Sequence, residues 1–459
     1  MTNILLITAD DMDGRTPGAF GGPAAATPRL DALAAEGMVF RRAHVAAAVC
    51  QPSRSAILTG RWPHRNGAEG FEPIRDGVGV FTDLLREAGY VTGILGKVDH
   101  LQPVERFGWD VARGMRELGL GRDPAAYGRA TEEFLAQAAA GGRPWFLMAN
   151  AHDPHRPFHG SRAEAGKWTA EERATYPAPS RTFDASEAEV PEFLPDLPDV
   201  RTECAEYLSS ARRCDDVVGA VLDALERSGA AADTLVVFLS DNGMAFPFAK
   251  ANCYLRSTLT PFVVRWPGVT EPGSAGDDAF VSMLDLFPTF CEAAGVAVPA
   301  DLDGRSLLAL LRGEPDAGRE RVFTVFHETS AKQRFEMRCT QDARFGYLWN
   351  AWSDGRAYRA ENMEGLTWPA MVAAAQDDPA VAERFAFYTT RAPEELYDLV
   401  ADPGCLHNLA ADPAFADELG RCRRHVAGWL AATGDPLESS YLAPESASSG
   451  ENSRSAGAV

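Results

Sequence analysis

The sequence predicts an α/β protein built on a large, mostly parallel β-sheet with helices on both faces. Short apolar runs bounded by turn residues alternate with helical patterns from the N-terminus to about residue 315. The apolar runs are continuous and do not alternate with polar residues, which is typical of strands buried on both faces. A chain of 459 residues, of which 46% are hydrophobic, is long enough to bury such a core.

Five strands and five helices are predicted in this part of the chain. The strands cover residues 4–8, 91–95, 145–150, 234–239 and 261–266, each an apolar run between turn residues. The helices cover residues 27–37, 81–88, 127–140, 203–228 and 283–294. Thr27-Pro28 marks the start of the first helix, because proline is favoured in a first turn. In folds of this class ligands bind beyond the carboxyl ends of the strands.

The pattern changes after residue 308 and predicts a smaller α+β domain with a short antiparallel sheet. Its strands are expected at residues 321–327, 336–340 and 344–351, and a closing helix at 412–433. We therefore expect a catalytic domain over residues 1–315, a C-terminal subdomain over 316–435 and a tail over 436–459. Residues 159–199, rich in Pro, Glu and Asp, are predicted to leave the main sheet as a long excursion. Residues 446–459, rich in Ser, Gly and Ala, are expected to be disordered.

Composition excludes several classes of partner. The chain has 44 Lys and Arg against 65 Asp and Glu, a net charge of −21, and no basic patch, which argues against nucleic acid and anionic membranes. No apolar run approaches the roughly 20 residues of a transmembrane helix. The N-terminus lacks the features of a signal peptide, so a cytoplasmic location is expected, with the eight widely spaced cysteines reduced. No feature of the sequence predicts an oligomeric state.

Two strand ends carry candidate metal ligands. Asp10 and Asp11 follow the first strand, and Asp241 and Asn242 follow the strand at 234–239. At one edge of a parallel sheet these residues would meet, and like charges so close need a cation. An all-oxygen set favours Ca²⁺ or Mg²⁺ over zinc. Alternatively, each pair only caps a helix or forms a turn.

A candidate reactive residue is Cys50, in the segment Cys50-Gln51-Pro52-Ser53-Arg54. Pro52 suits the first turn of a helix, so Cys50 is expected just before a helix N-terminus, where the dipole favours an anion. Arg54 would be near enough to pair with Cys50 or with a bound anion. The alternative is a buried structural thiol. A phosphatase loop would place five residues between Cys and Arg, whereas this chain has three.

The third candidate set is cationic and predicts an oxyanion as the ligand. The chain has only four lysines, and two of them, Lys97 and Lys250, fall just past predicted strand ends. The other members are His100, His152, His155, Arg156 and Arg256. For each of these taken singly the alternative is a solvated loop, and for His155, His159 and Arg256 the solvated loop is the better explanation.

Together these motifs resemble the type I sulfatases in order and spacing. The resemblance extends to about residue 435 and rests on Asp10-Asp11, Thr27-Pro28-Arg29-Leu30-Asp31, Cys50-x-Pro52-Ser53-Arg54 with Leu58-Thr59-Gly60, Gly96-Lys97, Ser240-Asp241-Asn242-Gly243, Val264-Arg265-Trp266-Pro267-Gly268 and Glu395-Leu396-Tyr397-Asp398-Leu399. Within that family, His152-Asp153-Pro154-His155-Arg156 and Arg213-x-Asp215 are most similar to the sulfamidases, or N-sulfoglucosamine sulfohydrolases. Two positions differ: sulfamidases carry arginine where Lys250 stands, and the Lys97-x-x-His100 spacing resembles iduronate-2-sulfatases.

The resemblance implies an alkaline phosphatase-like fold and a role for each candidate. A formylglycine-generating maturation enzyme would oxidise Cys50 to formylglycine, whose hydrated aldehyde attacks sulfur with one hydroxyl and expels sulfate with the other. Asp10, Asp11, Asp241, Asn242 and the formylglycine oxygen would hold Ca²⁺, or Mg²⁺ instead. Arg54 and Lys97 would keep nucleophile and metal in register, His100 would take the diol proton, and His152 and Lys250 would bind the sulfuryl oxygens and protonate the leaving group. His155, Arg156, Arg256 and His327 are candidate substrate contacts, although His327 could equally be an ordinary strand-end residue.

We therefore expect an enzyme that hydrolyses a sulfate ester or sulfamate of a small sulfated saccharide or another sulfated small molecule. One alternative is an O-sulfatase of aryl or sugar sulfates, and another is a phosphodiester or phosphonate monoester hydrolase on the same fold. A non-catalytic anion-binding protein with unmodified Cys50 is the third. Because the net charge is −21, anion binding must come from a local cluster of cations, which favours a small sulfated sugar over a long polyanion.

Overall fold

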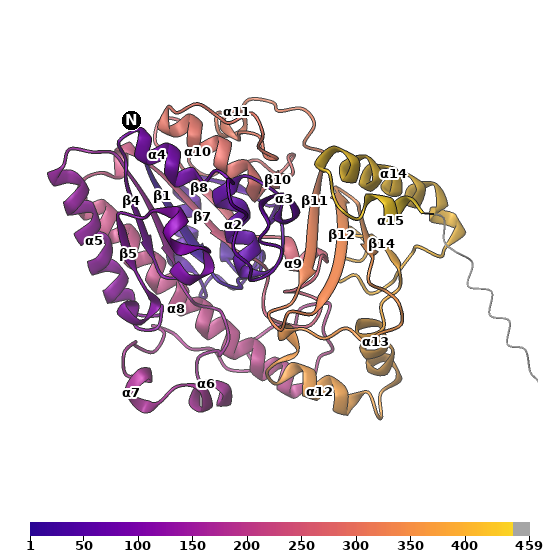
Figure 1. Cartoon of the computed structure of the whole chain (residues 1–459). Helices are drawn as coiled ribbons and strands as arrows, with labels where there is room; N and C mark the ends of the chain where they lie inside the picture. The colour runs from indigo at the N-terminus through magenta and orange to yellow at the C-terminus, as the bar shows by residue number, and fades with distance from the viewer. Residues whose placement is uncertain (444–459) are drawn as a thin grey trace, which may run out of the picture.

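The structure, a computed structural model, describes residues 1–443, which form a large sheet and a smaller one with helices around them (Figure 1). The large sheet has eight strands in the order β5-β4-β6-β1-β7-β8-β2-β9. Their bounds are β1 Asn3–Ala9, β2 Met38–Phe40, β4 Val91–Leu95, β5 Val111–Arg113, β6 Trp145–Asn150, β7 Thr234–Ser240, β8 Phe262–Arg265 and β9 Ser274–Ala275. A separate parallel pair joins β3 (Ala43–His44) to β10 (Val281–Ser282).

The five consecutive strands β5, β4, β6, β1 and β7 run parallel, while β8 is antiparallel to both β7 and β2. The sheet is thus mostly parallel, as predicted, and the ends of the five predicted strands differ from the observed ones by no more than two residues. The pattern could not identify β2, β5 and β9, because two or three residues are too few for a periodic signal.

Both faces of the large sheet are buried, which explains the continuous apolar runs. Along β1, Ile4 and Leu6 belong to one core cluster, whereas Leu5 and Ile7 belong to another on the opposite face. The first cluster is completed by α2 (Cys50–Thr59), α4 (Phe81–Glu87) and α10 (Leu286–Ala294). The second is completed by α1 (Pro28–Glu36), α5 (Pro124–Ala140) and α8 (Pro198–Ser228). Figure 1 shows α5 and α8 along this face of the sheet. The prediction of helices on both faces is confirmed.

The C-terminal sheet is antiparallel and has the strand order β11-β12-β13-β14. Its strands are β11 Arg321–Glu328, β12 Arg334–Asp342, β13 Phe345–Asn350 and β14 Glu394–Asp398. One face packs against α14 (Ala416–Thr433) through Val426 and Leu430, and the other belongs to a core cluster that includes Phe246 and Phe248 of the large domain. The short antiparallel sheet and the closing helix are therefore where the sequence predicted them, and β14 is an additional strand.

The remaining helices are short or lie in connecting segments. They are α3 Pro63–Asn66, α6 Arg162–Lys167, α7 Ala170–Arg173, α9 Leu255–Thr258, α11 Leu308–Leu311, α12 Thr367–Ala374, α13 Pro379–Thr389 and α15 Glu438–Leu442. The excursion at 159–199 carries α6 and α7, at the lower edge of the view in Figure 1. Helix α8 begins at Pro198, earlier than predicted, because its first turns are buried against the C-terminal part of the chain through Val200 and Cys204.

None of the eight cysteines, all of which lie in the described part of the chain, forms a disulfide. Among residues 1–443, no helix is both long enough and apolar enough to cross a membrane. The tail end at 446–459, predicted to be disordered, lies outside the described residues.

Candidate active site

The carboxyl ends of β1 and β7 bring four oxygen-bearing side chains together. The backbone N–H of Asp11 donates to Asp241 Oδ1 at 3.1 Å, and Asn242 Nδ2 donates to Asp11 Oδ1 at 2.7 Å. Asp10, Asp11, Asp241 and Asn242 are all fully buried. Asp11 has φ 67°, a left-handed conformation that non-glycine residues adopt infrequently and that is often found at functional sites. The two strand ends therefore meet at one point, as their order in the sheet requires.

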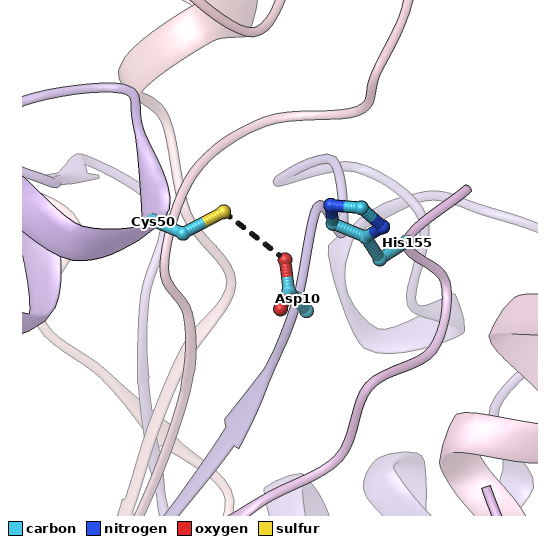
Figure 2. Close-up of side chains that lie close together, drawn as sticks. All are labelled: Asp10, Cys50 and His155. Carbon is cyan, nitrogen blue, oxygen red and sulfur yellow. Dashed lines mark hydrogen bonds between the residues drawn. The ribbon is translucent and has the colours of Figure 1, made fainter. Parts of the chain in front are cut away.

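Cys50 is the first residue of α2 and lies against this carboxylate cluster. Its Sγ donates to Asp10 Oδ1 at 3.4 Å and accepts from Lys250 Nζ at 3.3 Å. Cys50, Asp10, Asp11 and Asp241 each offer a ligand atom within 4.8 Å of the others. Cys50 and His155 lie on either side of Asp10 (Figure 2). Cys50 was expected just before the helix; it is the first helical residue because Val49 is the extended N-cap.

Arg54, one turn further along α2, ties the helix to three strand ends. Its guanidinium lies 3.0 Å (Nε) and 2.7 Å (Nη2) from Asp241 Oδ2, and Nη1 donates to Thr8 Oγ1 at 2.8 Å and to Asn150 Oδ1 at 2.6 Å. Nη2 is also 3.6 Å from Asp10 Oδ2. Arg54 is 0% exposed, so its charge is balanced within the site and not by solvent. This arrangement fixes the position of Cys50 relative to the carboxylates.

Two lysines complete the charge balance of the cluster. Lys97, which has φ 53°, pairs with Asp10, and Lys250 Nζ lies 2.7 Å and 2.9 Å from the two oxygens of Asp11. Burial alone would raise the pKa of Asp10, but the Lys97 ammonium and, to a smaller extent, the Arg54 guanidinium hold it well below its ordinary value. Burial opposes the charge of Lys250 as well, yet Asp11 raises its pKa well above the usual range. The Asp10 carboxylate and the Lys250 ammonium are therefore favoured in their charged forms.

Three histidines surround the cluster, and all are neutral at neutral pH. His152 Nδ1 is 3.7 Å from Asp10 Oδ2, His155 Nε2 is 3.8 Å from Asp11 Oδ2, and the two rings stack with centroids 4.7 Å apart. Burial and neighbouring lysines lower the pKa of both. His100, in a 3₁₀ turn, has its pKa lowered to about 2 by burial and by Lys97. Neutral imidazoles can accept or relay a proton.

The thiol of Cys50 is not activated by these surroundings. Burial raises its pKa well above the ordinary value, and Asp10 and Asp241 raise it further against the opposite effect of Lys250. A thiol is a nucleophile or a metal ligand only as the thiolate. An unmodified Cys50 therefore lacks the form in which cysteine attacks a substrate.

The oxygen-bearing side chains fit a hard divalent cation. Asn242 Oδ1 is buried and has no hydrogen-bond partner among residues 1–443, although its amide nitrogen is fully used. A buried carbonyl oxygen without a donor is costly unless a ligand occupies it. Three carboxylates and one amide oxygen are donors that Ca²⁺ and Mg²⁺ accept. Asp10, Asp11, Asp241 and Asn242 are thus a chemically suitable set for such an ion.

The structure places the other three candidate residues in ion pairs or in a separate cluster. Arg156 pairs with Glu203 and donates to the carbonyl of Ala245 at 2.7 Å and 3.0 Å. Arg256 pairs with Asp13 at 2.9 Å and 3.0 Å. His327, 2% exposed, lies 3.8 Å from Glu69 and beside the ring of His64. These contacts do not include the Cys50 cluster, in contrast to His155.

The sequence analysis missed two contributors to the site. Asn150, the last residue of β6, accepts from Arg54 and from Thr8 Oγ1 at 2.8 Å, and its amide donates to the carbonyls of Leu95 and Gly96. Its signal was a polar residue ending an apolar strand. Thr8 ends the predicted first strand in the same way. Both side chains hold Arg54 in place and take part in the site only through it.

Comparisons with known proteins reveal similarity along nearly the whole chain. A family model described as "Sulfatase" matches residues 2–296. Human N-sulphoglucosamine sulphohydrolase is 33% identical over 466 aligned residues, which cover 95% of this chain and 91% of that protein. A structure solved in complex with its substrate D-glucosamine-2-N,6-O-disulfate has a TM-score of 0.70 at 19% identity, with 95% of this chain and 98% of the other covered.

A phosphonate monoester hydrolase of Silicibacter pomeroyi is also similar, with a TM-score of 0.68 at 21% identity and coverage of 94% and 96%. At such identities the two structures establish a shared fold.

Proposed function

Since the chain belongs to the sulfatase family, we propose that it hydrolyses the sulfamate or sulfate group of a small sulfated saccharide at the Cys50 cluster. The observation that carries this proposal is the position of Cys50. It lies at the N-terminus of α2, with Sγ 3.4 Å from Asp10 and 3.3 Å from Lys250, inside a ring of carboxylates and cations. A helix N-terminus with fixed ammonium and guanidinium groups suits a small tetrahedral oxyanion.

We propose that Cys50 is converted to formylglycine by a maturation enzyme, and that the hydrated aldehyde supplies the hydroxyl that attacks sulfur. The protonated thiol of the unmodified chain gives an independent reason for such a change, because its pKa is raised well above the ordinary value by burial and by carboxylates. Asp10, Asp11, Asp241 and Asn242 would hold Ca²⁺ or Mg²⁺, which as a Lewis acid polarises an oxygen bound to it.

The remaining residues have roles that follow from their positions. Lys250 and Lys97 pair with Asp11 and Asp10 and lie where sulfuryl oxygens need compensation. His100 and His152 are neutral, so either can take a proton from the nucleophile, whereas the ammonium of Lys250 carries a proton that it can deliver to the leaving group. His155, stacked on His152, is proposed to contact the substrate.

The sulfamidase specificity is the finer part of the proposal. It is supported by the 33% identity to human N-sulphoglucosamine sulphohydrolase over 95% of this chain. The alternative within the same family is an O-sulfatase, which hydrolyses a sulfate ester and not a sulfamate. The similarity to a phosphonate monoester hydrolase supports a second alternative at the level of fold alone.

A substrate panel tests the proposal. The protein, expressed together with a formylglycine-generating enzyme, is assayed for sulfate release from N-sulfoglucosamine, glucosamine 6-O-sulfate and an aryl sulfate, and for turnover of a phosphonate monoester. We expect the highest kcat/KM for N-sulfoglucosamine. A preference for an O-sulfate would refute the sulfamidase specificity, and turnover of the phosphonate alone would refute the sulfatase activity. If no compound is turned over although peptide mass shows conversion at Cys50, the catalytic proposal fails.

A further inference from the structure

The loop His152–His155 follows β6 and carries the two stacked histidines. Its second residue, Asp153, is enclosed by two buried arginines. Arg213 of α8 approaches with Nε 2.6 Å from Oδ2 and Nη2 3.2 Å from Oδ1. Arg122, which precedes α5, donates from Nε to Oδ1 at 3.0 Å. Asp153 is 1% exposed and both arginines are 0% exposed. The carboxylate is thus bonded on both oxygens from two separate elements.

Arg122 also holds the backbone of the loop. Arg122 Nη2 donates to the carbonyls of His155 at 3.1 Å and Pro157 at 3.4 Å. At the start of the loop the N–H of His152 donates to the carbonyl of Gly121 at 2.9 Å, next to Arg122 in sequence. The two ends of the loop are therefore fastened to one short segment, and Asp153 fastens its middle.

Asp153 also connects the loop directly to the carboxylate cluster. Its backbone carbonyl accepts from the N–H of Asp10 at 3.3 Å. The two histidine contacts flank this hydrogen bond. His152 Nδ1 lies 3.7 Å from Asp10, and His155 Nε2 lies 3.8 Å from Asp11. A displacement of Asp153 would therefore shift both histidine rings against both carboxylates.

The excursion at 159–199 closes over the clamp formed by Arg122, Asp153 and Arg213. The Tyr176 ring faces both guanidinium groups, with centroid distances of 4.8 Å to Arg213 and 5.8 Å to Arg122, and its hydroxyl donates to Glu164 at 3.0 Å. Glu164 in turn lies 4.0 Å from Arg213. Buried ion pairs of this kind contribute little net stability compared with apolar packing, and their best-attested use is to specify one arrangement.

We propose that Asp153 is a positioning residue: clamped by Arg122 and Arg213, it sets the distances of His152 and His155 from Asp10 and Asp11. For its kinetic readout the proposal rests on the proposed function, in which His152 handles a proton and His155 contacts substrate. Groups that act on a transferring oxyanion lose effect steeply when misplaced, because catalysis depends on their alignment. The clamp touches no reacting atom and acts only through the loop.

The test compares Asp153→Asn with Asp435→Asn. Asp435 makes an equally buried pair with Arg338, at 2.6 Å and 3.1 Å, and its other ionisable neighbour is His64, so it is a matched control outside the Cys50 cluster. Both variants are expected to lower Tm, because each leaves a buried arginine less compensated. Only Asp153→Asn is expected to lower kcat per folded molecule, by about 100-fold, the loss associated with misplacement of about 1 Å. An unchanged kcat in Asp153→Asn, or an equal loss in both variants, would overturn the proposal.

Two further measurements keep the proposal testable. If Asp153→Asn does not fold, Arg213→Lys replaces it, since lysine keeps the charge but cannot make two parallel bonds. The kcat should again fall, and an unchanged kcat would refute the clamp. If the wild-type protein turns over no substrate, the proposed function fails separately, and a crystal structure of the variant decides. His152 and His155 displaced relative to Asp10 would support the clamp, and unmoved rings would refute it.

Discussion

Replacing Arg54 by alanine tests how much its buried ion pair with Asp241 contributes to the free energy of unfolding. The guanidinium makes four hydrogen bonds or ion-pair contacts of 2.6–3.0 Å, two with Asp241, one with Thr8 and one with Asn150. All of these partners are buried. The substitution therefore leaves the Asp241 carboxylate without its principal cation and leaves two neutral oxygens without a donor.

The expected loss follows from this inventory. Removing one partner of a buried ion pair costs about 3–5 kcal/mol, because the remaining charge is not solvated. A typical domain is stable by about 5–15 kcal/mol, so Arg54→Ala should fold but lie close to the limit. Ca²⁺ should restore part of the loss if it binds the native site, since a ligand at 100 times its Kd stabilises by about 2.7 kcal/mol.

Urea unfolding in EDTA, with and without added Ca²⁺, measures both effects. The matched control is Arg227→Ala, which breaks a pair with Glu132 of similar length, at 2.7 Å and 2.9 Å, but with side chains 59% and 47% exposed. Exposed pairs contribute about 0–1 kcal/mol, so the control should lose little. If Arg54→Ala loses no more than Arg227→Ala in EDTA, the electrostatic account of the site is wrong.

Three other perturbations have definite expected outcomes. Lys250→Met removes the ammonium between Asp11 and Cys50 and should lower kcat by about 100- to 1,000-fold, as for loss of one oxyanion donor; a kcat equal to wild type would contradict its role. EDTA should lower the wild-type Tm and Ca²⁺ should restore it, whereas Asn242→Leu should respond less; equal Ca²⁺ responses would argue against Asn242 as a ligand. Burial lowers the pKa of His44 to about 3, so between pH 6.5 and pH 3 the unfolded chain binds a proton that the folded chain does not. The free energy of unfolding therefore decreases as the pH is lowered, by about 2 kcal/mol from this residue at pH 5. Urea unfolding at pH 7 and pH 5 should therefore show a smaller acid loss in His44→Gln, and an identical loss would contradict this.

The strands of the large sheet could be predicted because burial on both faces leaves a pattern in the sequence itself. Every residue of β6 is buried, so Trp145 to Asn150 forms one unbroken apolar run with a polar end. Strand β14 lacks such a signal, because it contains Glu394 and Glu395. Glu395 is buried only through its bonds to Arg391, Asn350, Tyr254 and Tyr397, which tertiary structure supplies.

The same distinction applies to the site. Asp10, Asp241 and Lys97 follow predicted strands, and the topology of a parallel sheet then brings them to one edge. The clamp could not be predicted, because Arg122, Asp153 and Arg213 lie on separate elements and each alone resembles a solvated charge. Arg156 was a candidate substrate contact, and Arg256 was better explained by a solvated loop. The structure instead buries Arg256 and pairs the two arginines with Glu203 and Asp13.

The most direct measurement of the central claim is sulfate release by wild-type protein and by Cys50→Ala, each expressed with the maturation enzyme. Cys291→Ala is the control, because Cys291 is an equally buried cysteine in α10, in the core and outside the site. We expect wild type and Cys291→Ala to release sulfate and Cys50→Ala to release none above background. Undiminished sulfate release by Cys50→Ala would show that the reaction does not depend on this residue and would contradict the account.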